Sequence, residues 1–399
     1  MTADELHALL APGVLALIDS HVHDDPSAFS MRFHGSKALP VRAMAEQIAC
    51  RQKAARKLPS LSQFPLLYTR LGLEQASGER AAEWKAGLMS GRRMIDLTGG
   101  LGIDTIFFAR RFEQVVSCER DAVLAALAEY NRRAIGVTNV ETRVGDSAWI
   151  LEGFPDDSFD WVFVDPARRE QGGRSVGLEA TSPDVVALHD LMLRKASRVC
   201  IKASPALEIS GLEEKLPTLS SIVAVSVEGE CKEILLMLDR TQFVGRQPSV
   251  RAVCLDAEVF EIYSQERGKA ERVVSPVPGG WLYEPDAAII KARLVAVLAH
   301  DLKIGFLNHT VDYLTADRFI EKFPGRSFRV EECLPFKPKS FRTELSNRGI
   351  AKAAIQRRDF PHSVEELRKK YRLGESSSLF LFFTKDASGG LICMLCRKT

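Results

Sequence analysis

Glycines and carboxylates stand together at the end of one apolar run of the sequence. The stretch Asp96-Leu97-Thr98-Gly99-Gly100-Leu101-Gly102-Ile103-Asp104 ends a predicted strand and opens a predicted helix. Glycines at such a turn let the backbone approach a nucleotide-like ligand closely. The dinucleotide pattern Gly-x-Gly-x-x-Gly is met only in part, because Thr105 stands in place of the third glycine, and the Gly-Lys-Ser/Thr ending of a phosphate loop is absent. The charge of Asp104 would also repel a phosphate.

Carboxylates follow the next three predicted strands as well. Glu119, Asp146 and Asp165 each stand directly after an apolar run. Open α/β sheets bind ligands at the carboxyl ends of their strands, so these side chains are expected at one edge together with Asp96. Each could instead be a helix cap, but capping does not explain the coincidence with the glycine turn. S-adenosylmethionine is a ligand that suits glycines and carboxylates without a phosphate loop. Asp96 would contact its amino-acid part, Glu119 its ribose and Asp146 its adenine.

The elements that must position these side chains alternate between strand and helix. Strands are predicted at 93–97, 114–118, 140–144, 159–164, 198–201, 221–227 and 233–238, and helices at 103–112, 122–135, 183–196 and 209–216. This alternation predicts a parallel sheet with helices on both faces. The connection 228–232 is too short for a parallel crossover, so the last strand is expected to pair antiparallel. Residues 91–240 are therefore predicted to form one doubly wound α/β domain.

The segments on either side of this domain show other patterns. Residues 1–90 are predicted to be a helical N-terminal region, because apolar residues recur at helical spacing. Residues 241–325 are predicted to be a connecting region with a helix at 286–300. Residues 326–399 are predicted to be a small, basic α+β module, with strands at 328–333, 379–384 and 391–396 and helices at 348–358 and 363–372.

Charge is distributed unevenly along the 399 residues. The net charge is +2, but residues 291–399 contain 21 Lys and Arg against 12 Asp and Glu. A basic end on an acidic body favours a polyanionic partner. No run approaches the roughly 18 apolar residues of a membrane span. The eight cysteines are too scattered for a disulfide framework, which suits a reducing cytoplasm, and no metal site is expected because Cys393 and Cys396 lack a second pair.

The motifs resemble those of the class I, Rossmann-like, S-adenosylmethionine-dependent methyltransferases. Residues 96–104 are similar to the family's motif I, Cys118-Glu119-Arg120 to its acidic ribose loop, Gly145-Asp146 to its adenine loop and Asp165-Pro166-Ala167-Arg168 to its motif after the fourth strand. The whole chain also resembles bacterial RNA methyltransferases with a ferredoxin-like piece and a THUMP-like C-terminal domain, in which residues 73–77 lie against the cofactor.

The resemblance implies a seven-stranded Rossmann-like core and S-adenosylmethionine as the cofactor. The cofactor-binding residues that it implies are Gln75, Ser77, Asp96, Thr98, Gly99, Gly100, Gly102, Asp104, Glu119, Arg120, Asp146, Ser147 and Asp165.

Asp165, Pro166 and Arg168 are the predicted catalytic residues. Relatives that methylate base amines usually carry Asn/Asp-Pro-Pro-aromatic here, whereas this chain has Ala167 and Arg168. Asp165 would orient an amine or accept a proton, and the Arg168 guanidinium would replace the stacking ring. Methylation at carbon 5 of a pyrimidine needs a cysteine nucleophile, and none follows the fourth strand. Cys200 is expected in the core.

Basic residues suggest two contacts with nucleic acid. Arg168, Arg169 and Arg174 flank Gly172 and Gly173, and they form either a phosphate-contacting loop or an exposed basic loop. The C-terminal module offers either an RNA-facing surface or an ordinary solvated face, with Arg342, Arg348, Lys352, Arg357, Arg358, Lys369, Lys370 and Arg372.

The leading hypothesis is a cytoplasmic, S-adenosylmethionine-dependent methyltransferase of structured RNA, either rRNA or tRNA. One alternative is a methyltransferase of a protein or a small molecule. Another is a non-catalytic RNA-binding protein that keeps a methyltransferase-like core. The sequence predicts no membrane partner, and it leaves open the RNA, the methylated atom and the oligomeric state.

Overall fold

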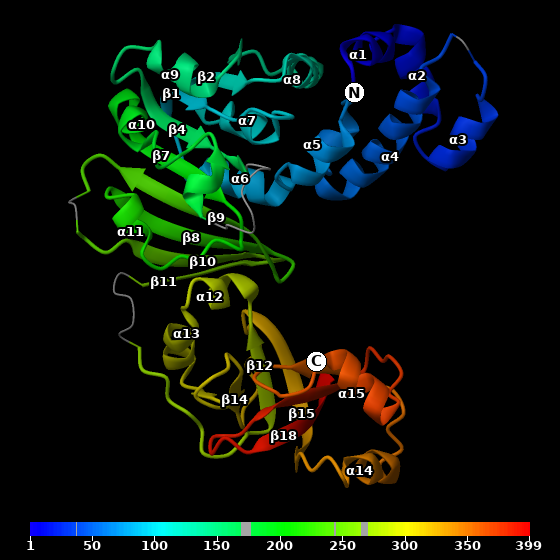
Figure 1. Ribbon diagram of the computed structural model, residues 1–399, viewed down its shortest axis with the longest axis vertical. Helices are drawn as coiled ribbons and strands as arrows, with labels where there is room; N and C mark the ends of the chain where they lie inside the picture. Colours follow the sequence, from blue (N-terminus) through cyan, green and yellow to red (C-terminus); the bar gives the residue numbers. More distant parts are fainter. Residues whose placement is uncertain (37, 169–176, 243–244, 265–269) are drawn as a thin grey trace. The chain divides into compact units, whose positions relative to one another are not determined.

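The computed structural model describes residues 1–36, 38–168, 177–242, 245–264 and 270–399 (Figure 1). The chain forms two compact units. The first contains residues 1–222 and 233–248, and the second contains residues 223–232 and 249–399.

Seven consecutive strands of a nine-stranded sheet, in the order β3-β2-β1-β4-β7-β9-β8, form the centre of the first unit. Strands β1, β2, β3, β4 and β7 pair in parallel, and β9 pairs antiparallel with β7. The tip of the β8–β9 hairpin belongs to the second unit. The strands are β1 (Gly91–Asp96), β2 (Phe112–Glu119), β3 (Val140–Val144), β4 (Phe159–Val164), β7 (Ala196–Ala203), β8 (Leu219–Val227) and β9 (Glu230–Asp239). The predicted Rossmann-like α/β core is confirmed.

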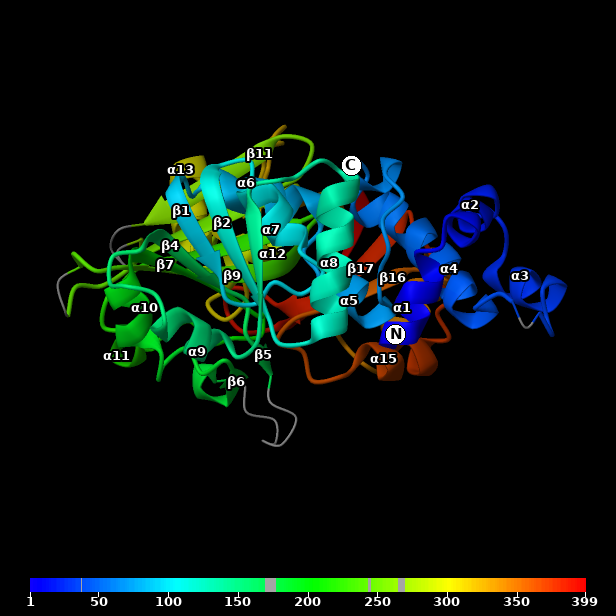
Figure 2. The same ribbon diagram turned by 90° about the horizontal axis from the view of Figure 1, so that it is seen from above.

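Helices cover both faces of this sheet (Figure 2). One face carries α6 (Glu79–Gly87), α7 (Ile103–Phe108) and α8 (Ala122–Ala134), and the other carries α9 (Ser147–Glu152), α10 (His189–Lys195) and α11 (Leu212–Lys215). Successive strand side chains point to opposite faces. Val162 and Val164 therefore pack in the cluster that contains Met192 of α10, while Phe163 meets Phe108 of α7 with ring centroids 4.8 Å apart. Both faces are thus buried, as a parallel sheet requires.

Residues 1–90 are helical, as predicted. One side-chain amide fixes a segment within this region, and another joins the region to the core. Gln47 donates to the carbonyl of Tyr68 and accepts from its N–H, and Asn131 of α8 does the same with Leu67. The helices are α1 (Ala3–Leu9), α2 (Pro12–Ser20), α3 (Pro26–Arg32), α4 (Val41–Lys57), η1 (Leu61–Gln63) and α5 (Arg70–Gln75).

A short two-stranded ribbon follows β4. Strand β5 (Ala167–Arg168) pairs antiparallel with β6 (Thr181–Ser182), and η2 (Leu178–Ala180) lies just before β6. Helix α10 begins six residues later than predicted, because Asp184 first accepts hydrogen bonds from the N–H groups of Val186 and Ala187 in an intervening turn.

The second unit is an α+β structure built on a separate sheet of seven strands, in the order β13-β14-β12-β15-β18-β17-β16. Cys393 and Cys396 lie three residues apart in β18, and they pack into two different hydrophobic clusters. The elements are β10 (Ser249–Leu255), β11 (Val259–Ser264), β12 (Trp281–Pro285), α12 (Ala287–Lys291), α13 (Val295–Leu302), β13 (Gly305–Phe306), β14 (Leu314–Ala316), β15 (Gly325–Pro335), α14 (Phe341–Asn347), β16 (Ala354–Arg357), α15 (Val364–Tyr371), β17 (Leu379–Lys385) and β18 (Leu391–Lys398).

Two predicted helices of this unit differ from the structure. The helix expected at 286–300 is divided into α12 and α13, because Arg293 between them adopts a left-handed backbone with φ of +59°. The helix expected at 348–358 is wrong, since α14 ends at Asn347 and residues 354–357 form β16, which pairs in parallel with β17. No helix among the described residues is both long and apolar enough to cross a lipid bilayer.

Candidate active site

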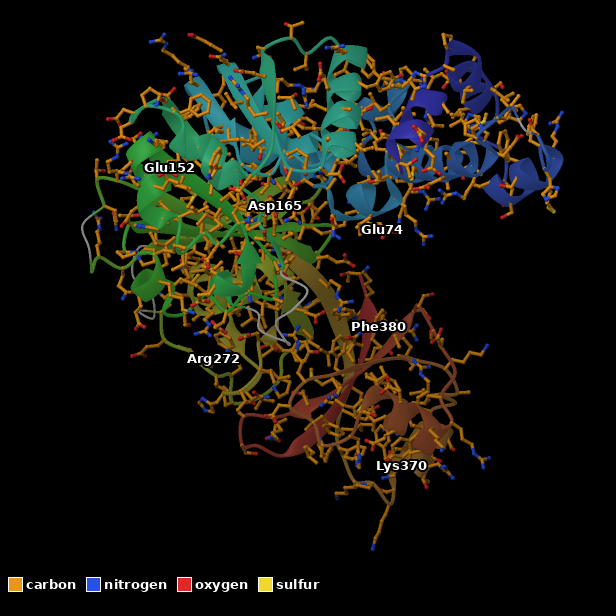
Figure 3. All side chains as sticks on the ribbon, turned by 45° about the horizontal axis from the view of Figure 1, so that its top comes forward. Glu74, Glu152, Asp165, Arg272, Lys370 and Phe380 are labelled. Carbon is orange, nitrogen blue, oxygen red and sulfur yellow. The ribbon has the colours of Figure 1, made fainter. Side chains whose placement is uncertain are left out.

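A cavity of about 270 Å³ lies in the first unit where β1 to β4 end. Its wall includes most of the predicted binding residues, namely Gln75, Ser77, Thr98, Gly99, Gly100, Asp104, Glu119, Arg120, Asp146, Ser147 and Asp165. Asp96, Gly102 and Pro166 are not part of that wall. Figure 3 labels Asp165, where the chain leaves β4, and Glu74, which precedes the wall residue Gln75 on α5.

The glycine turn fits its place for two different reasons. Gly99 packs on β2, since its N–H donates to the carbonyl of Cys118 at 2.7 Å and an added Cβ would lie 2.4 Å from Oγ of Ser117. Gly100 has a φ of +54°, and an added Cβ would find no atom closer than 3.9 Å. A side chain at Gly100 would therefore be strained and would enter open space. Gly102, with a φ of +78°, is the N-cap of α7 and does not itself line the cavity, although Leu101 and Ile103 on either side of it do.

Glu119, at the end of β2, binds the backbone of the glycine turn through its carboxylate. One carboxylate oxygen accepts from the N–H of Gly100 and the other from the N–H of Asp121, each at 2.9 Å. A carboxylate has about four acceptor sites, so two hydrogen bonds leave capacity for two hydroxyl groups. Glu119 is thus held by the backbone and can still accept from a ligand.

Asp146 caps a helix and also lines the cavity. Its Oδ1 accepts from the N–H of Trp149 at 3.1 Å at the beginning of α9, and the residue lines the cavity. The capping and binding interpretations of this aspartate are therefore compatible.

Asp96 supports the glycine turn through hydrogen bonds to two threonines. Its Oδ1 accepts from the N–H of Thr98 at 2.9 Å, and its Oδ2 accepts from the hydroxyl of Thr105 at 2.6 Å. The side chain is buried, and burial raises the pKa of Asp96 to about 7. The carboxyl group of Asp96 thus accepts hydrogen bonds from within the protein. The expected contact with the amino-acid part of a ligand stays a prediction.

A buried ion network joins the glycine turn to Asp165. It consists of Lys85, Asp104, Lys202, Asp165 and Glu233. Nζ of Lys85 lies 2.9 Å from Asp104 and 3.0 Å from Glu233, and Nζ of Lys202 lies 2.5 Å from Asp165 and 3.9 Å from Asp104. Lys85 is fully buried, and Lys202 is 8% exposed.

The two lysines of the network stay charged in spite of their burial. Burial opposes the charge, but the carboxylates of Asp104 and Glu233 raise the pKa of Lys85, and those of Asp165 and Asp104 raise the pKa of Lys202. Burial likewise opposes the charge of Asp104, and the two lysines hold its pKa below the usual range. The charge of Asp104 is therefore offset inside the protein, and Asp104 alone does not exclude a phosphate, contrary to the expectation from its position.

The motif after β4 turns into the β5–β6 ribbon. Ala167, Ser182 and Pro183 line the cavity beside Asp165, whose side chain is 37% exposed. Arg168 belongs to β5 by its backbone. The side chain of Arg168 and the whole of Arg169, Gly172, Gly173 and Arg174 lie outside the described residues.

Comparisons with known proteins agree with this geometry. Residues 325–398 match the model of the THUMP domain-like family. An uncharacterised S-adenosylmethionine-dependent methyltransferase of Mycobacterium tuberculosis is 27% identical over 354 residues, which cover 87% of this chain and 94% of the relative. A crystal structure from Porphyromonas gingivalis W83, provisionally assigned as a methyltransferase, has a TM-score of 0.85 at 25% identity and covers 100% of this chain and 99% of that one.

The chain is an S-adenosylmethionine-dependent methyltransferase. The fold, the glycine turn and the full-length relatives agree on this assignment. A further relative covers only the core: the 23S rRNA (uracil(1939)-C(5))-methyltransferase RlmD of Aeromonas salmonicida is 29% identical over 150 residues, 36% of this chain and 34% of RlmD.

Cys118, which lines the cavity of this methyltransferase, and Cys200 in β7 are both buried. Burial raises the pKa of Cys118 to about 12 and raises that of Cys200 further. The thiolate, not the thiol, is the nucleophile, so neither side chain is prepared for attack. Cys200 lies in the core, as expected.

Sequence reasoning missed two members of the ion network, Lys85 and Glu233. Each one interrupts an apolar pattern, since Lys85 stands among Ala81, Ala82 and Ala86 on α6, and Glu233 opens the apolar part of β9. A charge on an otherwise buried face is the signal that could have marked them, because such a charge requires a partner.

Proposed function

We propose that this methyltransferase transfers the methyl group of S-adenosylmethionine to a structured RNA, rRNA or tRNA, in the cytoplasm. The observation that carries the choice of RNA is an exposed cluster of basic residues in the THUMP-like segment, around the end of α15. The partial likeness of the core to an rRNA methyltransferase supports the same choice.

The cavity residues divide into groups that suit the parts of the donor. Glu119 would accept from the ribose hydroxyls and Asp146 from the adenine amino group, while Gly99 and Gly100 would let the backbone approach the donor closely. Gln75 and Ser77 would form the opposite wall. When bound, the donor supplies a methyl carbon attached to a positively charged sulfur.

Asp165 is the proposed contact with the atom that receives the methyl group. It lies in the cavity wall, and its backbone N–H donates to Oγ1 of Thr98 at 2.7 Å, which fixes it beside the glycine turn. Alignment of nucleophile and donor supplies much of the rate in a displacement of this kind. Asp165 suits that task, because it lines the cavity and its backbone is fixed beside the glycine turn.

The basic cluster around the end of α15 forms what we call the α15 patch. It consists of exposed side chains for which no ion pair with a described carboxylate is found: Arg342, Lys352, Lys369, Lys370 and Arg372. Arg342 donates to the carbonyl of Lys370, which joins α14 to α15, and Lys352 packs against Gly374. Lys370 is labelled in Figure 3. Closely spaced free cations of this kind suit a phosphate backbone.

Arg348 and Arg358 are engaged inside the module instead. Arg348 pairs with Glu332 and Glu344, and Arg358 pairs with Glu284. The proposed RNA surface therefore contains fewer basic residues than the sequence suggested.

The chemistry named for RlmD is not carried over to this chain. A pyrimidine methylated at carbon 5 requires a cysteine nucleophile, and Cys118 and Cys200 are buried thiols with raised pKa values. We therefore propose RNA as the substrate class without the uracil carbon as the target.

Mass spectrometry of nucleosides tests the proposal. RNA from cells with and without the protein is digested, and one methylated nucleoside should disappear without it and return when the purified enzyme acts on that RNA with S-adenosylmethionine. The Asp165→Ala variant should bind the same RNA and not restore the nucleoside. Unchanged RNA methylation, with label appearing in protein or small molecules, would favour the alternative substrates. RNA binding without any transfer would favour a non-catalytic protein.

A further inference from the structure

The side chain of Asp165 is fixed at one oxygen and open at the other. Its Oδ2 lies 2.5 Å from Nζ of Lys202, while no described residue contacts Oδ1. Its backbone is fixed through Thr98. A carboxylate restrained in this way presents one acceptor atom to the cavity in a defined direction.

Lys202 is itself held in place by the network. It extends from β7, it is 8% exposed, and the carboxylate of Asp104 lies 3.9 Å from its ammonium group. Lys85 occupies the other side of Asp104 at 2.9 Å and contacts Glu233. Charges alternate from Glu233 through Lys85, Asp104 and Lys202 to Asp165, with three carboxylates and two ammonium groups. Asp165 is the more exposed end of this series, with a side chain 37% exposed against 3% for Glu233.

We infer that Lys202 is a positioning residue that orients the carboxylate of Asp165, so that the methylated atom is a nitrogen or oxygen that carries its own hydrogen. This inference rests on the proposed role of Asp165. An ionised carboxylate only accepts hydrogen bonds, so it is suited to orient an N–H or O–H group.

The transfer balances with this assignment. The lone pair of the nucleophile forms the bond to the methyl carbon, the carbon–sulfur bond breaks, and its electron pair stays on sulfur. The proton of the nucleophile passes to the free oxygen of Asp165 and then to solvent, on the side where Asp165 is exposed. A positioned acceptor of this kind contributes roughly 10²- to 10⁴-fold in rate.

A double-mutant cycle tests whether Lys202 acts through Asp165. The enzymes are wild type, Lys202→Met, Asp165→Asn and the double variant, with Lys202→Arg as the conservative substitution. Single-turnover rates are measured with S-adenosylmethionine and RNA from cells that lack the protein. Affinity for S-adenosylhomocysteine and the urea midpoint show whether each variant is folded.

The inference predicts a specific pattern of rates. Lys202→Met should slow transfer by roughly ten- to a hundred-fold with donor affinity within about threefold, and Lys202→Arg should recover part of the loss. The double variant should be no slower than Asp165→Asn, because coupled residues are not additive. Losses that multiply, or a Lys202→Met enzyme with the wild-type rate, would overturn the positioning role.

The position of the transferred methyl group tests the second half of the inference. Nucleosides labelled by the wild-type enzyme should carry it on an amine, on a ring nitrogen that carries a hydrogen before transfer, or on a hydroxyl oxygen. A methyl group on carbon would overturn the assignment while leaving RNA methylation intact. If the wild-type enzyme methylates no RNA, the proposed function itself fails, and this inference fails with it.

Discussion

The carboxylate of Glu119 accepts a hydrogen bond from the backbone N–H of Gly100, with the two atoms 2.9 Å apart. Glu119 ends β2 and Gly100 follows β1, so this bond joins two neighbouring strands at their carboxyl ends. The switch point of a doubly wound sheet is where such ends leave a crevice for a ligand. The glycine turn and the acidic loop, recognised separately in the sequence, thus form one surface.

Gly100→Val should abolish binding of S-adenosylmethionine. The left-handed backbone disfavours valine, and the new side chain would enter the cavity. Gly136→Val is the matched control, because Gly136 also has a positive φ, with open space around it and no place in the cavity wall. Titration calorimetry should show no binding for Gly100→Val and near wild-type affinity for Gly136→Val. Equal affinity in both variants would remove Gly100 from the site.

Asp146→Ala should weaken donor binding beyond the effect of a lost helix cap. The substitution removes the cap of α9 and costs about 1 kcal/mol of stability. Asp121→Ala removes the cap of α8 in the same way, without touching the cavity wall. The two variants should be similarly destabilised in urea. Only Asp146→Ala should raise the dissociation constant, by roughly tenfold or more, as the loss of a hydrogen bond to a charged group predicts.

The parts of the site that lie close together in sequence were predictable, and the parts that meet across the fold were not. The glycine turn and the acids after the strands follow from local patterns. Lys85 lies before the sheet begins and Glu233 lies in its last hairpin, and their contact with each other requires the finished fold. The strand at 354–357 was missed for the same reason, because its partner β17 is more than twenty residues away.

The role of Asp96 shows a second limit of sequence reasoning. A carboxylate at the end of a strand can face a ligand or support a turn, and both uses give the same sequence pattern. Thr98 and Thr105 show that Asp96 supports the turn, since each donates to one of its two oxygens. Its contact with a ligand stays a prediction.

Lys85→Met should destabilise the first unit strongly. The substitution leaves Glu233 without its ammonium partner in a buried place, and breaking a buried pair costs about 3–5 kcal/mol. The double variant Lys85→Met/Glu233→Leu should cost less, because both charges leave together. Lys53→Met is the control, since Lys53 pairs with Glu74 at the surface and its loss should cost about 0–1 kcal/mol. Urea unfolding measures all three, and equal losses for Lys85 and Lys53 would contradict the network.

The buried carboxyl of Asp96 should make stability depend on pH. Its pKa rises from 3.8 to about 7 on folding, so between pH 4 and 7 the native state keeps a proton that the unfolded chain has lost. The free energy of unfolding should therefore fall as pH rises through this window, by roughly 2–4 kcal/mol relative to Asp96→Asn. Urea unfolding followed by tryptophan fluorescence at several pH values measures the difference. A difference between the two proteins that does not change with pH would show that Asp96 is ionised when folded.

Neutralising the α15 patch should weaken RNA binding and reduce its dependence on salt. The variant Lys369→Ala/Lys370→Ala/Arg372→Ala removes three exposed cations, and each lost phosphate contact should lower the slope of log K against log salt by about 0.7–0.9. The control removes three exposed arginines of the first unit, Arg42, Arg92 and Arg133, and so changes the net charge equally. Fluorescence anisotropy with labelled RNA at several salt concentrations should show a slope smaller by about two in the patch variant and a smaller change in the control. Donor affinity should stay unchanged in both, since none of these residues lines the cavity. Equal losses in the two variants would mean that net charge, and not the α15 patch, holds the RNA.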